Sequence, residues 1–356
     1  MSVNSKAAPV RFKNVTKIYG KDVLAVDNID LKIEAGKLVT LLGPSGCGKT
    51  TTLRMIAGLE MATSGSIYIG DQDVTLLPAT DRDVSMVFQS YALFPHMSVL
   101  ENVSYGLKMA GIKKEESHEK SINTLQLIGL ENFESRMPSE LSGGQQQRVA
   151  VARAIVLEPK VLLFDEPLSN LDAKLRRQVR EDIRGIQQKL GVTTIYVTHD
   201  QEEALAISDK VIVMNDAIIA QEGSPKNLYH NPETKFVANF IGDSNIIKAK
   251  IETKQNTQYK ISFANISHEA ESNLDLSDDI SIAIRPEKII INDTKIENTL
   301  DAKVINSSFV GNTYQYSLET SEGKLFAISS DTKKFKSNNE IVFISFEDDA
   351  ITLLLD

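Results

Sequence analysis

The sequence of 356 residues contains one cysteine, Cys47, which excludes an internal disulfide. It contains no apolar run near the ~18–20 residues that a membrane-spanning helix requires. The N-terminus also shows no apolar signal-peptide region. We therefore expect any role at a membrane to depend on a partner.

Positive charge is also scarce, because 39 Lys and Arg stand against 48 Asp and Glu and leave a formal net charge of −9. A surface that binds nucleic acid non-specifically is basic, so the charge argues against that function class. Sustained heptads are missing too, which argues against a long coiled coil. The length exceeds that of one average domain and allows a substantial core.

Against these absences stands a complete phosphate-binding pattern, G-x-x-x-x-G-K-[ST]. A buried strand is expected at residues 38–42 before it, and a helix at 51–57 after it. The glycines permit a curled backbone that aims N–H groups at phosphate oxygens, and the lysine and threonine can contact phosphate and Mg²⁺. A glycine turn with an incidental lysine is the structural alternative. The pattern comprises Gly43, Pro44, Ser45, Gly46, Cys47, Gly48, Lys49 and Thr50.

An acidic pair follows a second apolar run, residues 161–164, which is typical of a central strand in a parallel sheet. Ligand-binding groups gather at the ends of such strands. Asp165 is placed to hold Mg²⁺, directly or through water, and Glu166 to act as the base or polariser of an attacking water. A solvated acidic pair at a strand end is the structural alternative.

Two more polar residues end strand-like runs. Gln89 follows residues 84–88, and His199 follows residues 194–198. Either side chain could be structural, but their placement after strands of the same sheet makes both candidates for sensing a γ-phosphate.

A second candidate anion site is the segment Leu141, Ser142, Gly143, Gly144 and Gln145, directly before a helix-favouring run at 146–154. Small residues at a helix N-terminus leave backbone N–H groups open, and the helix dipole favours an anion there. An ordinary helix cap is the alternative.

These motifs occur in the order found in an ATP-binding cassette, and the match covers about residues 8–240. The chain resembles the ATPase subunit of a bacterial importer from the branch that includes maltose, polyamine, sulfate and ferric-iron systems. The resemblance implies an α/β P-loop NTPase with a RecA-like core, an antiparallel β subdomain and a helical subdomain, followed by an all-β small-barrel domain.

The resemblance also implies residue roles. Tyr19 would stack on adenine, although a tyrosine packing on its own domain is an equal alternative. Residues 43–50 with Thr51 would bind ATP. Thr50, Gln89 and Asp165 would hold Mg²⁺, and Glu166, His199 and Gln89 would act in hydrolysis.

The segment from Leu141 to Gln145 gains its meaning from the same resemblance. One P-loop already holds the phosphates within the chain, so Ser142, Gly143, Gly144 and Gln145 would contact ATP held by a second copy. Asp172 would cross the interface of the same homodimer.

The chain divides, on this interpretation, into a cassette at residues 8–242, with its helical subdomain at about 90–150, and a C-terminal domain at 243–356. Short runs rich in isoleucine, valine and aromatics separated by Asn, Asp, Ser and Gly predict the all-β barrel. These runs are residues 246–251, 259–263, 280–284, 304–310, 314–318, 325–328, 341–346 and 351–355. Residues 284–287 match a motif of the oligonucleotide-binding-like (TOBE) domain of this branch, which implies regulation and dimerisation but no nucleic-acid binding.

The implied partners are an integral-membrane permease, indirectly an extracytoplasmic solute-binding protein, and a second copy of the chain. The chain would lie at the cytoplasmic face of the inner membrane. Residues 90–96 resemble the segment that receives a permease helix, with a packed loop as the alternative. The substrate hypothesis is ferric iron or polyamine first, then phosphonate, sulfate or sugar.

Two other function classes stay open at this point. A soluble cassette ATPase that acts on nucleic acid or ribosomes usually has two cassettes or a long coiled coil, whereas this sequence has one P-loop. A non-catalytic nucleotide-binding regulator is the third, and ATP hydrolysis by the purified protein would exclude it.

Overall fold

The computed structural model describes residues 6–169, 171–276 and 278–355, and its contacts group the chain into two compact units, residues 1–225 and 226–356. Each unit is described by itself. Over the residues so described, no helix combines the length and the apolar character needed to cross a membrane.

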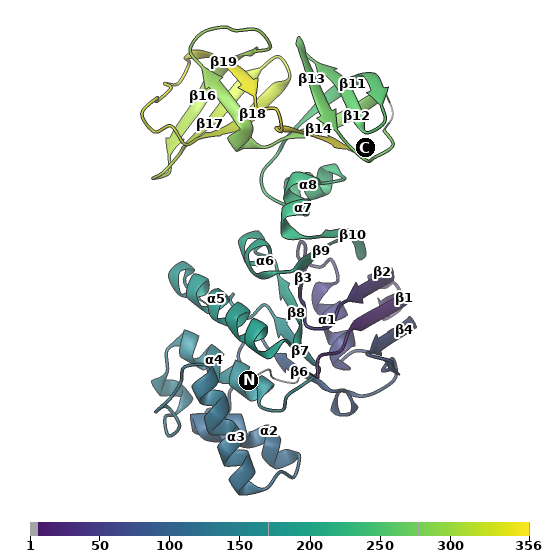
Figure 1. The fold of residues 1–356 in the computed structure, drawn as a ribbon, viewed down its shortest axis with the longest axis vertical. Helices are drawn as coiled ribbons and strands as arrows, with labels where there is room; N and C mark the ends of the chain where they lie inside the picture. Colours follow the sequence, from purple (N-terminus) through teal and green to yellow (C-terminus); the bar gives the residue numbers. More distant parts are fainter. Residues whose placement is uncertain (1–5, 170, 277, 356) are drawn as a thin grey trace. The chain divides into compact units, whose positions relative to one another are not determined.

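The first unit is built on a six-stranded sheet in the order β10-β9-β3-β8-β7-β6 (Figure 1). All neighbours are parallel except β9 and β10. The strands are β3 (Leu38–Leu42), β6 (Val84–Val87), β7 (Val161–Asp165), β8 (Thr193–Thr198), β9 (Lys210–Asn215) and β10 (Ile218–Gly223).

Both faces of this sheet are buried, which explains why its central strands are continuous apolar runs. Successive side chains point to opposite faces. On β7, Leu162 and Phe164 join one hydrophobic cluster, and Val161 and Leu163 join the other. The charged side chains of the parallel strands therefore lie at strand ends, and the candidate site lies at one such end.

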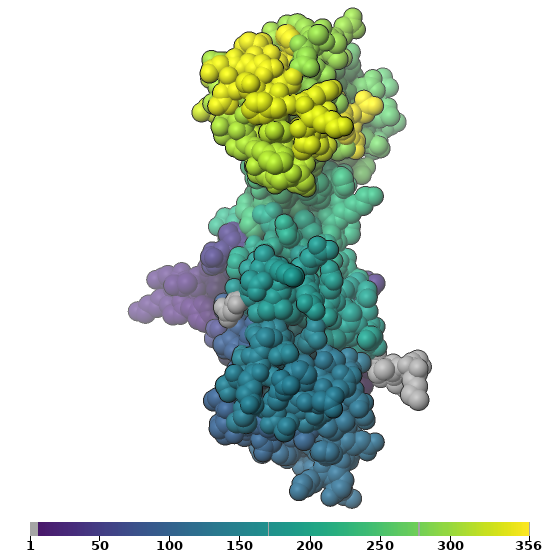
Figure 2. Space-filling model, turned by 90° about the vertical axis from the view of Figure 1, so that its left-hand side faces the viewer, coloured from purple at the N-terminus to yellow at the C-terminus, as the bar shows by residue number. Residues whose placement is uncertain are grey.

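A second, four-stranded antiparallel sheet in the order β2-β1-β4-β5 covers one face together with α1. Figure 2 shows its purple N-terminal residues projecting from the first unit. These elements are β1 (Val10–Tyr19), β2 (Val23–Ile33), β4 (Ser64–Ile69), β5 (Gln72–Asp73) and α1 (Lys49–Ala57).

Helices pack on the opposite face, where α4 and α5 join the cluster that contains Phe164 and Tyr196. The helices α2 and α3 extend this cluster into the helical subdomain (Figure 1). The helices are α2 (Val99–Met109), α3 (Lys114–Leu127), α4 (Gly143–Ile155), α5 (Ala173–Leu190) and α6 (Gln201–Ile207).

The second unit packs two five-stranded antiparallel sheets over one hydrophobic core. The first has the order β13-β12-β11-β14-β20, with β11 (Asn245–Gln255), β12 (Gln258–Phe263), β13 (Ile266–Glu271), β14 (Asp279–Ile284) and β20 (Ile351–Leu354). The other has the order β15-β19-β16-β17-β18, with β15 (Ile289–Asn292), β16 (Leu300–Phe309), β17 (Tyr314–Thr320), β18 (Gly323–Ser329) and β19 (Ile341–Phe346). Two short helices precede the sheets, α7 (Pro225–His230) and α8 (Lys235–Phe240).

The predicted fold class is confirmed, with its parallel core, antiparallel sheet, helical subdomain and C-terminal all-β domain. Each of the eight predicted C-terminal runs overlaps a strand, and β13 and β15 were not predicted. The β13 sequence, ISHEAE, is too polar to stand out, and it forms a strand because β12 pairs with all of it. Isoleucines dominate β15, but it has only four residues.

The segment 226–242 packs with the C-terminal strands, although the sequence grouped it with the cassette. Arg285, which is 8% exposed, explains this arrangement. Its guanidinium donates to the carbonyl oxygens of Tyr229, Ala238 and Asp243 at 2.6, 2.9 and 3.0 Å. It also lies 4.2 Å from the centroid of the Tyr229 ring. The extent of the cassette as a functional domain stays a prediction.

We expect Arg285→Ala to destabilise the second unit by on the order of 3 kcal/mol, because three partly or fully buried carbonyl groups each lose a charged donor at once. Hydrogen exchange measured by mass spectrometry on the full chain would show faster exchange in peptides from α7, α8 and β14. The control is Lys295→Ala, which removes an exposed ion pair with Asp301 and should change stability by less than about 1 kcal/mol. Equal exchange in the two variants would contradict the role given to Arg285.

Candidate functional site

The phosphate-binding loop lies between β3 and α1, and its glycines are required by the backbone. Gly46 and Gly48 have φ of 83° and 100°, in the left-handed region that side chains disfavour. A Cβ on Gly43 would lie 2.3 Å from the Met214 carbonyl oxygen, so this position also has no room for a side chain. The buried Lys49 ammonium donates to the carbonyl oxygens of Gly43 and Pro44, both at 2.8 Å. The lysine charge is thereby held inside the curl of the loop.

Thr50 and Asp165 meet at the end of the sheet. The Thr50 hydroxyl donates to Asp165 Oδ1 at 3.3 Å, linking the first turn of α1 to the end of β7. Burial raises the pKa of Asp165, and nearby Arg54 and the Thr50 hydrogen bond oppose that shift. A desolvated carboxylate beside a hydroxyl gains from a neighbouring cation, so this pair can hold one.

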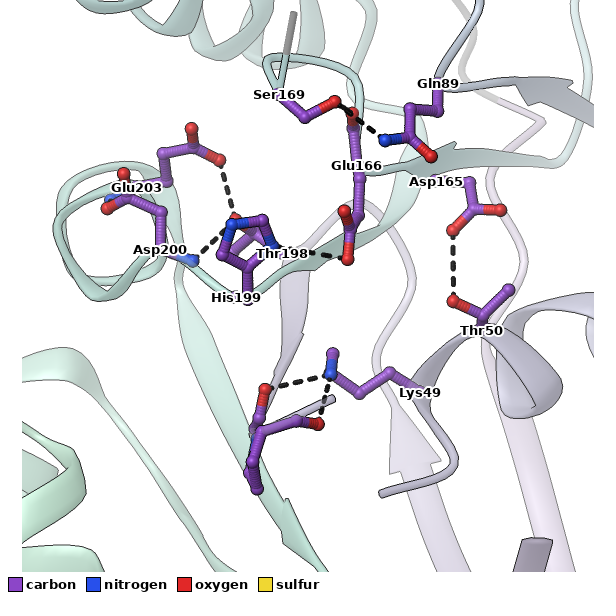
Figure 3. A network of polar contacts seen from close by, with 12 residues as sticks. Lys49, Thr50, Gln89, Asp165, Glu166, Ser169, Thr198, His199, Asp200 and Glu203 are labelled. Atoms are coloured by element: carbon purple, nitrogen blue, oxygen red, sulfur yellow. Dashed lines mark hydrogen bonds and ion pairs between the residues drawn. The ribbon is translucent and has the colours of Figure 1, made fainter. Parts of the chain in front are cut away.

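Glu166 and His199 form the second pair at this edge (Figure 3). Glu166 Oε1 lies 3.4 Å from His199 Nδ1, and the two side chains are 25% and 60% exposed. The Glu166 backbone has φ of 45° and its N–H donates to the Val197 carbonyl at 3.1 Å. A left-handed residue after β7 turns the chain, and this hydrogen bond holds Glu166 against β8.

Gln89 reaches the same edge from the end of β6. Its Nε2 donates to Ser169 Oγ at 3.1 Å, and the Ser169 hydroxyl donates to the Glu166 carbonyl at 3.1 Å. Ser169 had no role in the sequence analysis. It links Gln89 to the backbone of Glu166.

The segment before α4 forms a helix cap in the structure, as the structural alternative predicted. Ser142 Oγ accepts from the Gln145 N–H, and Gln145 Oε1 accepts from the Ser142 N–H at 2.9 Å. The two glycines lie against α5 and the segment just before it: a Cβ on Gly144 would lie 2.9 Å from Leu175, and one on Gly143 3.1 Å from Leu171. The Ser142 side chain is exposed.

The remaining predicted residues contact their own neighbours. Lys17 Nζ lies 4.7 Å above the Tyr19 ring, and Asp172 caps α5 by accepting from the Leu175 N–H at 3.0 Å. Cys47 is buried beside Lys49, Ser45 is exposed in the loop, and Thr51 lies in the first turn of α1. Asn170, which follows Ser169 in the sequence, lies outside the described residues.

The structure thus gathers Lys49, Thr50, Gln89, Asp165, Glu166 and His199 at one edge of the sheet (Figure 3). Tyr19, Asp172 and Ser142–Gln145 are held by local contacts instead. Sequence reasoning missed the partly buried network behind His199, which contains Arg176, Tyr196, Thr198, Asp200 and Glu203. An acid about one helical turn after the Thr-His-Asp sequence at residues 198–200 was its only signal.

The loop after Gln89 is fastened to the helical subdomain. Tyr91 and Ala92 both have left-handed φ values, 60° and 49°. Arg153 on α4 donates to their carbonyl oxygens at 3.0 and 2.7 Å. The buried Asn102 on α2 donates to the Phe94 carbonyl at 3.1 Å. Residues 90–96 therefore form a packed loop, which is the structural alternative, and this loop is also attached to α2 and α4.

Comparisons with known proteins agree with this geometry. A family model described as ABC transporter matches residues 26–169, and one described as TOBE domain matches residues 282–354. The chain is 49% identical over 352 residues, 99% of each chain, to the Fe(3+) ions import ATP-binding protein FbpC of Agrobacterium fabrum. It is 53% identical over 319 residues, 90% of each chain, to the protein of the same name from Brucella abortus.

Among solved structures, the chain resembles a dimeric post-hydrolysis state of the ATP-binding cassette MJ0796 bound to ADP and Pi. The identity is 33% and the TM-score 0.53, over 61% of this chain and 98% of that one. The P-loop, the carboxylate pair at the end of β7 and the full-length likeness lead to one conclusion. The chain belongs to the ABC transporter family as an ATP-binding cassette subunit with a C-terminal TOBE domain.

Proposed function

We propose that this chain hydrolyses ATP as one half of a homodimer and thereby drives ferric-iron import through a membrane permease. One observation carries the chemical part of this proposal: Glu166 Oε1 lies 3.4 Å from His199 Nδ1 at the sheet edge that also holds Lys49. An acid and an imidazole beside a phosphate loop can position and polarise a water for attack on a phosphoryl group.

Each loop residue has a role that its geometry supports. The backbone of residues 43–51 contacts the phosphates, and Lys49 turns from its two carbonyl acceptors to the β- and γ-phosphates. Tyr19 stacks on adenine, with its half-buried ring at the end of β1. Because Lys17 already covers one face of that ring, adenine takes the other.

The residues around Thr50 fit Mg²⁺. A hydroxyl, a carboxylate and an amide oxygen, from Thr50, Asp165 and Gln89, are hard oxygen donors, and Mg²⁺ in nucleotide sites takes few protein ligands beside phosphate and water. The raised pKa of Asp165 supports the fit, because a cation would compensate its burial. Mg²⁺ bound here would neutralise charge on the phosphates.

Glu166 acts as the base toward the attacking water, and His199 orients that water and contacts the γ-phosphate. The 25% exposure of Glu166 leaves its carboxylate accessible. Gln89 senses the γ-phosphate. Its position depends on that of Glu166, because Ser169 connects the Gln89 amide to the Glu166 backbone.

The dimer follows from the second anion site. Ser142, Gly143, Gly144 and Gln145 contact ATP bound to the other copy, and Asp172 lies at the same interface. The exposed Ser142 hydroxyl supports this role, and the resembling cassette MJ0796 is described as a dimer. The loop fastened by Arg153 and Asn102 meets the permease at the cytoplasmic face of the inner membrane.

The assignment of ferric iron as the substrate is inferred from the similar proteins. Proteins named for Fe(3+) import match 90–99% of the chain at 49–53% identity, so conservation extends through the C-terminal unit. We infer that ferric iron is delivered by an extracytoplasmic binding protein to the permease that this chain drives.

Glu166→Gln should retain ATP binding and lower the hydrolysis rate by at least about 100-fold, because the base is lost while the shape is kept. An ATP-bound dimer should accumulate, which size-exclusion chromatography with bound-nucleotide analysis would detect. The control is Glu181→Gln on the exposed face of α5, which should hydrolyse ATP at the normal rate. Near-normal turnover in Glu166→Gln would remove Glu166 from its role.

Ser142→Arg should leave nucleotide binding to the monomer intact and abolish hydrolysis, because the new side chain blocks the composite interface. Ser98→Arg is a matched control, since Ser98 caps α2 with the same reciprocal hydrogen bonds to Glu101. Its loss should cost about 1 kcal/mol of stability and leave the ATPase rate unchanged. Normal hydrolysis by Ser142→Arg would contradict the dimer sandwich.

The transport role is tested on the assembled complex. We expect tagged chain to co-purify with integral-membrane subunits, and a binding protein loaded with Fe³⁺ to stimulate ATPase activity in proteoliposomes and to deliver radiolabelled iron. The same complex with Glu166→Gln controls for uptake without hydrolysis. Stimulation by a polyamine-loaded binding protein, with none by the iron-loaded form, would overturn the substrate assignment.

A further inference from the structure

We propose that Glu203 is a positioning residue for hydrolysis: its buried carboxylate holds, through Thr198 and Asp200, the turn that carries His199. The inference rests on the function proposed for His199 and goes beyond it, because Glu203 itself reaches no substrate. It adds a second element, Arg176, which connects this turn to the segment next to Asp172.

Glu203 is a buried acid that the hydrolytic mechanism does not otherwise use. It lies on α6 and is 4% exposed, and its Oε2 accepts from the Thr198 hydroxyl at 2.8 Å and the Tyr196 hydroxyl at 3.1 Å. Burial raises the pKa of Glu203, and these two hydrogen bonds oppose that shift. An acid is costly in such a place unless it is well paired, so its presence calls for a reason.

The Glu203 carboxylate fixes the turn that contains His199. The Thr198 hydroxyl donates to Glu203 and accepts from the Asp200 N–H at 2.9 Å, so one relay fixes both neighbours of His199 (Figure 3). Asp200 is fixed a second time, because its Oδ1 accepts from the Glu203 N–H at 3.1 Å.

His199 itself has little packing to fix it. Its side chain is 60% exposed, and its polar contact is with Glu166 at 3.4 Å. The direction of the imidazole is therefore set by the backbone on either side. A shift of about 1 Å in a group of this kind is enough to cost a large part of the rate.

Arg176 connects the turn of His199 to the segment at the proposed dimer interface. From α5, its Nη1 donates to Asp200 Oδ2 at 3.0 Å and its Nη2 to the Leu171 carbonyl at 3.2 Å, while its Nε lies 3.8 Å from Glu203 Oε1. Leu171 precedes Asp172, the residue assigned to the interface. One guanidinium thus spans the turn of His199 and a segment that the second copy would contact.

The test uses Thr198→Val, which keeps the shape of the side chain and removes the relay. We expect the ATP hydrolysis rate to fall about 10- to 100-fold while ATP affinity, measured by calorimetry, stays within about twofold. Thr198→Ser should restore most of the rate, because it restores the hydroxyl. Glu203→Gln keeps an acceptor oxygen but loses the charge facing Arg176. Its hydrolysis rate should lie between those of Thr198→Val and Thr198→Ser.

Tyr196→Phe is the matched control. It removes a hydrogen bond to the same Glu203 oxygen, but the Tyr196 hydroxyl lies outside the relay that reaches His199. Its hydrolysis rate should stay within about threefold of the parent. Equal losses in Tyr196→Phe and Thr198→Val, accompanied by equal falls in melting temperature, would show a purely structural role and overturn the inference.

His199→Ala separates this inference from the proposed function. If His199→Ala is inactive and Thr198→Val hydrolyses ATP normally, the positioning role of Glu203 is wrong and the function of His199 stands. If His199→Ala itself hydrolyses ATP at the normal rate, the proposed function of His199 is wrong, and the positioning role falls with it. Failure of Thr198→Ser to recover the rate would also count against the relay.

Discussion

The hydrogen bond from the Glu166 N–H to the Val197 carbonyl continues the β7–β8 pairing one residue beyond Asp165. It holds the left-handed turn at Glu166 against the strand that leads to His199. Because both faces of the sheet are buried, charged side chains gather where the strands end. The candidate site is therefore a consequence of sheet packing, and this backbone hydrogen bond keeps Glu166 close to the strand that ends before His199.

The sequence was sufficient for the parts of the site that are adjacent along the chain. Residues 43–50 and the pair Asp165–Glu166 could be predicted from the sequence, because each of them directly follows or ends the strand that positions it. It was insufficient for groups brought together by tertiary packing. Ser169 meets Gln89 across 80 residues, and Arg176 meets Asp200 across 24, and neither pairing has a local pattern. The same limit applies to β13, whose polar sequence becomes a strand only by pairing with β12.

At Ser142, the structural and functional interpretations turn out to be compatible. The cap uses the hydroxyl oxygen as an acceptor, which leaves the hydroxyl hydrogen available to an anion. The first N–H groups of a helix have no intrahelical partner, and Gly143 and Gly144 add no side chain that would cover them. Asp172 shows the same combination, since it caps α5 and is proposed to lie at the same interface. A residue that shapes a helix end also fixes what the end can bind.

The candidate site combines exposed side chains with buried ones that hold them in position. His199 is 60% exposed, as a group must be if it meets a nucleotide and a second copy, whereas Glu203 behind it is 4% exposed. An exposed side chain cannot be held by packing, so its precision comes from the backbone next to it. A buried carboxylate with two hydroxyl donors supplies that precision at the desolvation cost seen in the raised pKa of Glu203. On the proposed mechanism, the buried Glu203 does not contact the substrate, and it allows His199 to remain accessible.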